Sequence, residues 1–445
     1  MKKPTLPSKS WHELVREIDP QRLLSLVLNN PEVRATIGGR YRHWDSLRHL
    51  DPPGDLTAEE WWAGVRMTRV QISQPVPLED REAEPFTIAL PGVMLQMLQQ
   101  VDRNASGQIA LSEQVTNPAT RKRYLVSSLI EEAITSSQLE GASTSRRVAK
   151  EMLRSGRRPR TKSEQMILNN YRAMNFVREH SNAPLTPEAV LELHRIVTED
   201  TLDDPTAAGR LQTNEDQRIG VFDEYGELLH APPDASDLPR RLQAMCDFAN
   251  REDEDDDYLH PVVRSIIVHF WLAYDHPFVD GNGRTARALF YWSMLHHGYW
   301  LTEFLTVSSI LKKAPAKYAR SYLYTEWDDN DLTYFVLYQL EVLLRAIDEL
   351  QKYLRRKMRE VRDTEQLLKT TDLNHRQVAL IGYALRTPGA TFSFRTHQMS
   401  HNIAYQSARN DLLDLESRGL VRKRKSGRAF IFFPVDDLAE HLRQS

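Results

Sequence analysis

The chain has 445 residues, which is enough for two or three domains. A hydrophobic content of 41% allows real cores, and a formal net charge of -3 excludes a uniformly basic protein, so any nucleic-acid contact must come from a local patch. The single cysteine, Cys246, excludes an internal disulfide and fits a reducing compartment. The N-terminal stretch lacks an apolar signal core and no apolar run could span a bilayer, so we expect a cytoplasmic location and no membrane contact.

The first section, residues 1–85, is predicted to be helical. Residues 23–28 form an apolar run that Asn29-Asn30-Pro31 ends. Aromatic residues gather in this section, and we expect them to pack against the next domain, with a partner surface as the alternative: Tyr41, Trp44, Trp61 and Trp62. Residues 73–91 carry several prolines, which indicates an extended connection.

A helical domain is expected from residue 86 to 350. Apolar spacing predicts one helix over residues 121–138, ended by Gly141, and two more over 163–180 and 187–199. Between residues 217 and 232, two short extended runs flank a turn that contains a glycine, which predicts a β-hairpin.

The stretch 276–287, HPFVDGNGRTAR, gathers chemically active side chains between apolar helices. His276 titrates near neutral pH and can act as a general base. Asp280 is a hard oxygen ligand of the kind that Mg²⁺ accepts beside a phosphate. The Gly-Asn-Gly centre leads into a predicted helix N-terminus, a site for phosphate. Arg284 and Arg287 lie three positions apart on that helix, on one face.

This stretch resembles the signature of the Fic (Fic/Doc) family, HPFx(D/E)GNGRxxR, at every defined position. The resemblance implies a mainly α protein, a Fic-type helical bundle with a β-hairpin flap at about 217–232. It also implies a nucleotidyltransferase that moves AMP from ATP to a Ser, Thr or Tyr hydroxyl of a target protein, itself included. His276 would be the base and Asp280 the Mg²⁺ ligand. The nucleotide would be bound by Gln217, Arg218, Ile219, Gly220, Asp280, Gly281, Asn282, Gly283, Arg284, Thr285, Ala286, Arg287 and Tyr318.

The helix at about 121–141 ends in a second short motif. Ser136, Glu140 and Gly141 match the inhibitory pattern (S/T)xxxE(G/N) of many Fic proteins. The resemblance implies that Glu140 pairs with Arg287 and crowds the γ-phosphate of ATP, so that the enzyme is autoinhibited. The alternative is an ordinary carboxylate on a solvated helix. Near Tyr318, a position that is often asparagine in the family appears here as Thr325, which leaves the base preference open.

A separate C-terminal domain is expected from residue 372 to 445, after a linker helix at 351–371. Helices at 377–385, 396–403 and 406–418 precede a basic hairpin, an order that resembles a winged helix. Such a surface would fit double-stranded DNA, and a protein-contact domain is the alternative. The recognition helix would begin with Ser407, Ala408, Arg409 and Asn410, and the wing would carry Arg422, Lys423, Arg424, Lys425 and Arg428.

Two other functions stay open from the sequence. One is a DNA-binding regulator in which the Fic module senses a nucleotide. The other is the reverse enzyme, a phosphodiesterase that removes AMP from a modified protein. The sequence names neither the target nor an oligomeric state, although a homo-oligomer is compatible with it.

Overall fold

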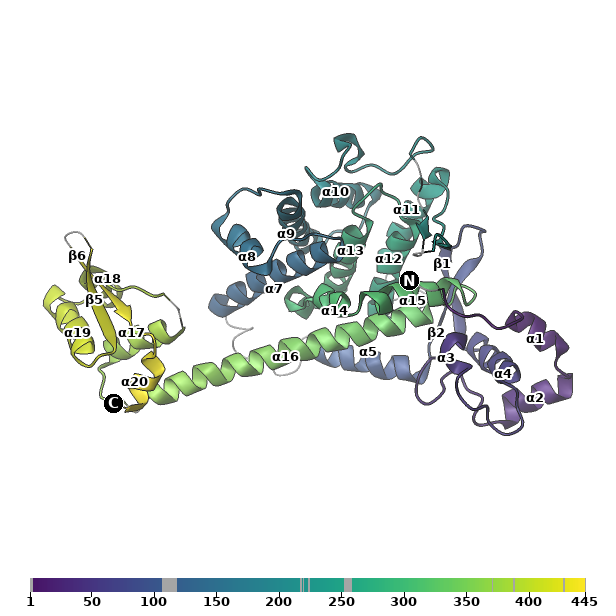
Figure 1. Cartoon of the computed structure of the whole chain (residues 1–445), viewed down its shortest axis with the longest axis horizontal. Coiled ribbons are helices and arrows are strands. Elements are labelled where there is room, and N and C mark those ends of the chain that lie inside the picture. The colour runs from purple at the N-terminus through teal and green to yellow at the C-terminus, as the bar shows by residue number, and fades with distance from the viewer. Residues whose placement is uncertain are drawn as a thin grey trace. The chain divides into compact units, whose positions relative to one another are not determined.

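The computed structural model describes residues 3–105, 118–216, 218, 220–222, 225–251, 258–369, 371–386, 389–426 and 429–444. Gln217, Ile219 and Arg428, all predicted to take part in binding, therefore lie outside the described residues. The chain divides into two compact units, Met1–Leu350 and Gln351–Ser445. Helices predominate in both, so the fold is mainly α (Figure 1).

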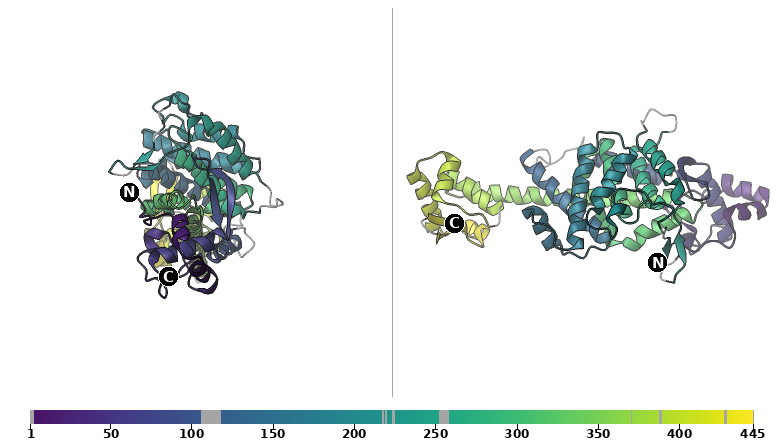
Figure 2. Two further views of the ribbon diagram at one scale, coloured as in Figure 1. Left: turned by 90° about the vertical axis from the view of Figure 1, so that its right-hand side faces the viewer. Right: turned by 90° about the horizontal axis from the view of Figure 1, so that it is seen from above.

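The N-terminal section of the first unit contains α1 (Trp11–Glu17), α2 (Pro20–Asn29), α3 (Trp44–Leu47) and α4 (Ala58–Val70). Ser10 and Thr57 form capping boxes that start α1 and α4. The three tryptophans of the predicted aromatic cluster are buried in this section's own core, whereas Tyr41 packs with Ala89 and Tyr334 of the following region. Purple in Figure 2, the section lies at one end of the first unit.

The stretch predicted as an extended connection forms an antiparallel hairpin of β1 (Ser73–Glu79) and β2 (Pro85–Ala89). Ser73 pairs with Ala89 and the register shifts between Pro75 and Glu79. The helix α5 (Gly92–Ala105) follows directly.

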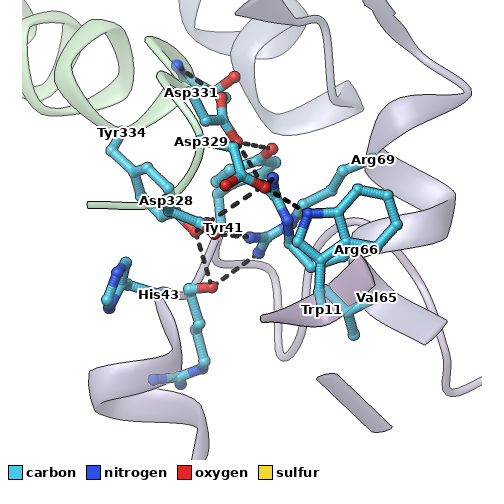
Figure 3. A network of polar contacts seen from close by, with 12 residues as sticks. Trp11, Tyr41, His43, Val65, Arg66, Arg69, Asp328, Asp329, Asp331 and Tyr334 are labelled. Carbon is cyan, nitrogen blue, oxygen red and sulfur yellow. Dashed lines mark hydrogen bonds and ion pairs between the residues drawn. The ribbon is translucent and has the colours of Figure 1, made fainter. Parts of the chain in front are cut away.

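A buried charge network joins the N-terminal section to the turn that follows α15 (Pro315–Glu326) (Figure 3). Arg66 contacts three aspartates, with Nη1 3.2 Å from Asp328 Oδ2 and 3.4 Å from Asp331 Oδ2, and Nη2 3.0 Å from Asp329 Oδ2. Arg69 donates from Nη1 to the Tyr334 hydroxyl at 2.6 Å. Both arginines are buried, and burying a charge is costly unless it is paired. The arginines of the N-terminal section and the aspartates of the turn therefore compensate each other.

Helices α12 (Pro261–Asp275) and α13 (Asn282–His296) pack side by side in the main core (Figures 1 and 2). Nearly every residue of α12 is buried, which explains why it is apolar all round. The helices around this pair are α7 (Pro118–Leu139), α8 (Arg146–Ser155), α9 (Lys162–His180), α10 (Pro187–Thr198), α11 (Leu238–Ala249) and α14 (Val307–Lys313), with 3₁₀ turns at Pro205–Ala207, Ala235–Asp237 and Trp300–Phe304.

The predicted hairpin is present as β3 (Val221–Phe222) and β4 (Leu228–His230). These strands are antiparallel, with Val221 opposite His230 and Phe222 opposite Leu228, and the register shifts between the two pairs. Val221, Phe222 and Leu228 expose much of their apolar side chains. We call residues 217–232 the flap.

The long helix α16 (Thr333–Lys369) ends in the second unit. That unit also contains α17 (His375–Arg386), α18 (Phe394–His401), α19 (Tyr405–Ser417), the hairpin of β5 (Val421–Ser426) and β6 (Ala429–Pro434), and α20 (Leu438–Gln444). Its own core includes Ile381, Leu412 and Phe432. Across the described part of the chain, every helix is too short or too polar to cross a bilayer.

Candidate active site

The loop between α12 and α13 takes its shape from three positions. His276 ends α12 in the left-handed conformation, with φ 46°, and its N–H donates to Leu272 O at 3.1 Å. Gly281, with φ 86°, starts α13, and a Cβ there would lie 2.7 Å from Thr198 Cγ2. Asn282 fastens the loop, because its Oδ1 accepts from Phe278 N at 3.0 Å and its Nδ2 donates to Phe278 O at 2.7 Å. The predicted phosphate ligand Asn282 thus has its amide engaged in shaping the loop.

His276, the first residue of this loop, is half-buried. Burial, together with the neighbouring His230 and Arg218, lowers the pKa of His276 to about 4. The imidazole is therefore neutral at pH 7. A neutral imidazole can accept a proton, which is the state that a general base requires.

Asp280 and Arg284 lie together beside the loop. The Asp280 side chain is about half exposed, its Oδ1 accepts from Gly281 N at 2.6 Å and its Oδ2 lies 3.4 Å from Arg284 Nη2. Arg284 is fully buried and donates from Nη1 to Val197 O at 3.0 Å. Burial lowers the pKa of Arg284, with Asp280 opposing the effect. The guanidinium predicted to bind phosphate is thus largely held by protein acceptors.

The first turn of α13 supplies backbone donors. Thr285 donates from both N and Oγ1 to Gly281 O at 2.9 Å, and Ala286 is buried in the core, so their side chains point away from solvent. The first N–H groups of a helix lack intrahelical acceptors and carry a partial positive charge. Asn282 and Gly283 occupy these positions. The turn is therefore a site for an anionic group.

An electrostatic contact joins α7 to α13. Arg287 Nη2 lies 2.8 Å from Glu140 Oε1, and the same guanidinium donates from Nε to Ser136 Oγ at 2.9 Å and from Nη2 to Ser136 O at 3.1 Å. Burial lowers the pKa of Arg287, but Glu140, Tyr318 and Glu132 together outweigh burial, so the pKa of Arg287 is raised. Gly141, with φ 88°, follows directly and lets the chain turn away.

Glu140 also reaches the glycine of the loop. A Cβ on Gly283 would lie 2.3 Å from Glu140 Oε1 and 3.0 Å from Glu140 Cδ. Only a glycine at this position lets the carboxylate lie against the first turn of α13. Glu140 thereby occupies the space beside the turn that would receive an anion.

Two of the predicted nucleotide contacts from the flap are described by the structure. Arg218 donates from Nη2 to Asp275 O at 2.8 Å and from Nη1 to Gln212 Oε1 at 2.6 Å. The guanidinium thus lies on the last carbonyls of α12. Gly220 passes close to the opposite strand, since a Cβ there would lie 2.5 Å from Leu228 Cδ1.

Tyr318 lies on α15, away from the loop residues in sequence but within the same core. Its hydroxyl is 2.8 Å from His269 Nε2 and 3.1 Å from the Tyr322 hydroxyl. Burial raises the pKa of Tyr318. Thr325, seven positions later on α15, donates to Ser321 O at 3.2 Å and is buried.

Sequence reasoning missed several residues that shape the site. His194 accepts from Gly209 N at 3.0 Å through Nδ1, so its Nε2 donates to Asp280 O at 2.9 Å. Its ring stacks on Phe278 with the centroids 3.7 Å apart, and burial lowers its pKa to about 4. The one sequence feature that could have indicated His194 is its position on the apolar face of the predicted helix 187–199. Glu132 on α7 accepts from Ser308 N at 3.1 Å and is buried, which anchors α7 beside α14.

The residues present fit a magnesium ion held mainly by phosphates. Among the residues that the structure describes, no three His, Cys, Asp or Glu side chains gather into a metal cage. Mg²⁺ beside a nucleotide commonly uses one or two carboxylates plus phosphate oxygens and waters. The half-exposed Asp280 next to the first turn of α13 suits that arrangement.

The loop thus brings together a neutral histidine, a half-exposed carboxylate and the N-terminus of a buried helix. Residues 184–294 match the model of the Fic/DOC family.

Curated relatives carry the name protein adenylyltransferase Fic. The one from Drosophila willistoni is 33% identical over 137 residues, 29% of this chain and 25% of that protein. The one from Nematostella vectensis is 33% identical over 115 residues, 26% of this chain and 24% of that protein. The chain thus spans about a quarter of the length of these relatives.

A solved structure shares the fold. It is a Fic family protein from Desulfovibrio desulfuricans G20, with 19% identity and a TM-score of 0.53, and the match covers 78% of this chain and 98% of that one. The helical Fic fold expected from the sequence is therefore confirmed.

Proposed function

We propose that this protein is an adenylyltransferase that moves AMP from ATP to a hydroxyl side chain of a target protein, its own chain included. The observation that carries the proposal is the loop 276–287. It combines a neutral His276 with the anion-binding start of α13, between helices of the Fic fold. The names of the matched relatives support the same activity. A cytoplasmic location belongs to this proposal, and it suits Cys246, whose thiol has its pKa raised to about 12 by burial.

The reaction assigns separate tasks to the loop residues. His276 accepts the proton of the target hydroxyl while the hydroxyl oxygen bonds to the α-phosphorus. The bond from that phosphorus to the bridging oxygen breaks, and pyrophosphate leaves with the electron pair. The first N–H groups of α13 and a freed Arg287 meet the phosphate charge. Asp280 would hold Mg²⁺, which neutralises phosphate charge when it is bound.

The contact between Glu140 and Arg287 supports autoinhibition. The carboxylate occupies the guanidinium that would otherwise reach the γ-phosphate, and it lies against Gly283. ATP then binds in a pose that is unsuited to transfer. Ser136 holds the other edge of the same guanidinium, so α7 controls Arg287 through two residues.

The test is transfer of label from α-labelled ATP to the protein itself and to proteins of a lysate. His276→Ala should abolish transfer and largely retain nucleotide binding, measured by calorimetry, because the phosphate ligands remain. His180→Ala, at an exposed histidine of α9, is the matched control and should transfer like wild type. Transfer by His276→Ala at a rate near wild type would rule out the proposed base.

Replacing Glu140 distinguishes AMP transfer from the reverse reaction, the removal of AMP from a modified protein. If Glu140 positions a water for hydrolysis, then Glu140→Gly should stop removal of AMP from a supplied AMPylated target. If Glu140 only inhibits, the same variant should increase transfer. Glu140 lies against the first turn of α13, where a phosphate would bind, and this position supports the second reaction.

A second candidate function, DNA binding, rests on the exposed strand β5. Arg422, Lys423, Arg424 and Lys425 are all exposed on it, after three helices in winged-helix order. Arg409, also exposed, lies on α19. Lys423 already pairs with Glu416 at 2.8 Å, so the other cations of the strand carry most of the available charge.

DNA binding by the full chain should fall steeply with salt, because bound cations release counterions from the phosphates. Alanine at the four cations of β5 should weaken binding and flatten the salt slope by about one for each lost phosphate contact. The control replaces four cations of α8 in the first unit: Arg146, Arg147, Lys150 and Arg154. Equal salt slopes for the two variants would make the hairpin a protein-contact surface.

A further inference from the structure

The C-terminal end of α12, which places His276, is capped by two side chains of the flap. His230 Nε2 is 2.9 Å from Tyr274 O, and Arg218 Nη2 is 2.8 Å from Asp275 O. Arg218 Nη1 also lies 3.4 Å from His276 O. The last carbonyls of a helix lack intrahelical donors and carry partial negative charge, so donors from the flap stabilise this end.

The geometry of His230 requires an extra proton. A carbonyl oxygen only accepts, so Nε2 must bear a hydrogen toward Tyr274 O. The other ring nitrogen, Nδ1, lies 2.7 Å from Glu326 Oε2, a hydrogen-bond distance. The two atoms must therefore share a proton, because an ionised carboxylate and a bare Nδ1 would present lone pairs to each other. We call His230 and Glu326 the clasp.

The charged groups around the clasp have other partners. Asp275 is bound by Arg241 Nη2 at 2.6 Å and by the Trp271 indole N–H at 3.1 Å. Asp80, on the far side of Tyr274, accepts from Asn330 Nδ2 at 2.9 Å. Glu326 Oε2 is the acceptor that lies within hydrogen-bond distance of Nδ1, whereas the Arg218 guanidinium has no acceptor atom. The clasp side chains are about 10% and 16% exposed.

The position of Glu326 is fixed independently of the flap. It is the last residue of α15, and the turn that follows contains the three aspartates bound by Arg66. Trp327, between them, donates from its indole N–H to Leu229 O at 3.5 Å. The flap strand β4 is thus fastened to the end of α15 by adjacent residues.

We propose that His230 and Glu326 are positioning residues for the transfer reaction, and that their shared proton keeps the flap docked on the backbone that holds His276 in its left-handed conformation. This inference rests on the proposed function. Without the shared proton, the Glu326 carboxylate would face a bare Nδ1 and repel it. Strand β4 would then separate from Glu326, and Tyr274 O would lose the hydrogen bond from His230 Nε2. The backbone at His276 would no longer be held in the conformation that positions the imidazole.

The test uses full-length protein in the Glu140→Gly background, so that transfer is measurable, together with two clasp variants. His230→Ala should lower kcat by about 100-fold, the scale of a misplacement of about 1 Å, with little change in KM for ATP. Glu326→Gln removes the need for the shared proton, because its amide N–H can donate to a neutral Nδ1. Glu326→Gln should therefore keep a kcat close to that of the parent, whereas His230→Ala loses it. Glu349→Gln, at an exposed glutamate of α16, is the control and should behave as the parent.

Nitrogen NMR of protein labelled with ¹⁵N-histidine tests independently of activity whether His230 and Glu326 share a proton. The His230 ring signals, assigned by their absence in His230→Ala, should show hydrogen on both nitrogens at pH 7 in the parent and on one nitrogen in Glu326→Gln. A bare Nδ1 in the parent, or a kcat for His230→Ala equal to that of the parent, would overturn the proposal. If no variant transfers label, the proposed function fails, and the NMR result still decides whether the clasp exists.

Discussion

Replacing Glu140 with glycine should release Arg287 and activate transfer. The carboxylate lies 2.8 Å from a guanidinium that is 3% exposed and that also donates to Ser136. Glu140 follows the last residue of α7, so a glycine there leaves the interior of the helix intact. The change therefore removes one contact and leaves its surroundings in place.

The size of the effect follows from the contact. A charge-assisted hydrogen bond contributes about 1.5–3 kcal/mol. About a third of the Glu140 side chain is exposed, so solvent screens the pair and the lower end applies. At about 1.4 kcal/mol per decade, we expect transfer to rise about ten-fold or more. Glu140→Gln, which keeps an acceptor for Arg287 but loses the charge, should give a smaller rise.

The assay is initial-rate transfer from α-labelled ATP at saturating ATP and Mg²⁺, for self-modification and for a lysate target. Adding His276→Ala should remove the gain, because the gain depends on the same base. The affinity for ADP, which lacks the γ-phosphate, should increase only modestly. Equal rates for wild type and Glu140→Gly would refute autoinhibition and leave Glu140 a structural residue at the end of a helix.

Three further changes test the fold and the loop. Arg66→Met should lower the free energy of unfolding by about 3–5 kcal/mol, because it leaves the buried Asp328 and Asp331 without the guanidinium that pairs with them. Arg22→Met, at a solvent-exposed arginine, is the control and should lower it far less, and urea denaturation compares the two variants. His269, whose pKa burial lowers to about 3, takes up its proton near pH 6.5 when unfolded, so stability should fall as the pH falls from 6.5 toward 3, by about 2 kcal/mol at pH 5. A His269→Gln variant should show a flatter fall, and an equal slope would contradict the assignment. Asn282→Ala, which loses both of its loop hydrogen bonds, should lower stability by about 1–3 kcal/mol and reduce transfer; unchanged transfer would show that the loop keeps its shape without them.

Local patterns predicted the central helices and the active-site loop. Thr186 caps α10, with Pro187 in its first turn, as its sequence indicates, and the predicted hairpin of the flap is present. These features depend on neighbours within a few positions, which a sequence displays directly. The pairing of Glu140 with Arg287, 147 positions apart, was accessible only through the family resemblance.

Long-range polar contacts escaped prediction for a physical reason. His230 and Glu326 are 96 positions apart, and Arg66 and Asp328 are 262 apart. Charged residues usually lie at the surface, so nothing local marks them as buried partners. The same limit applies to Arg284, which was expected to bind phosphate and is held largely by Val197 O, because the carbonyl that receives it belongs to another helix.

The network of Arg66 and Arg69 has a consequence for how such a protein can evolve by rearrangement of its parts. The N-terminal section has its own apolar core, yet its two buried arginines depend on the turn after α15. A gene fusion that moved this section alone would leave Arg66 without its aspartate partners, and a deletion of the section would leave the aspartates without Arg66. We therefore expect evolution to keep the N-terminal section and the helical domain that follows it together. A recombination event that preserves the network would have to move both of them.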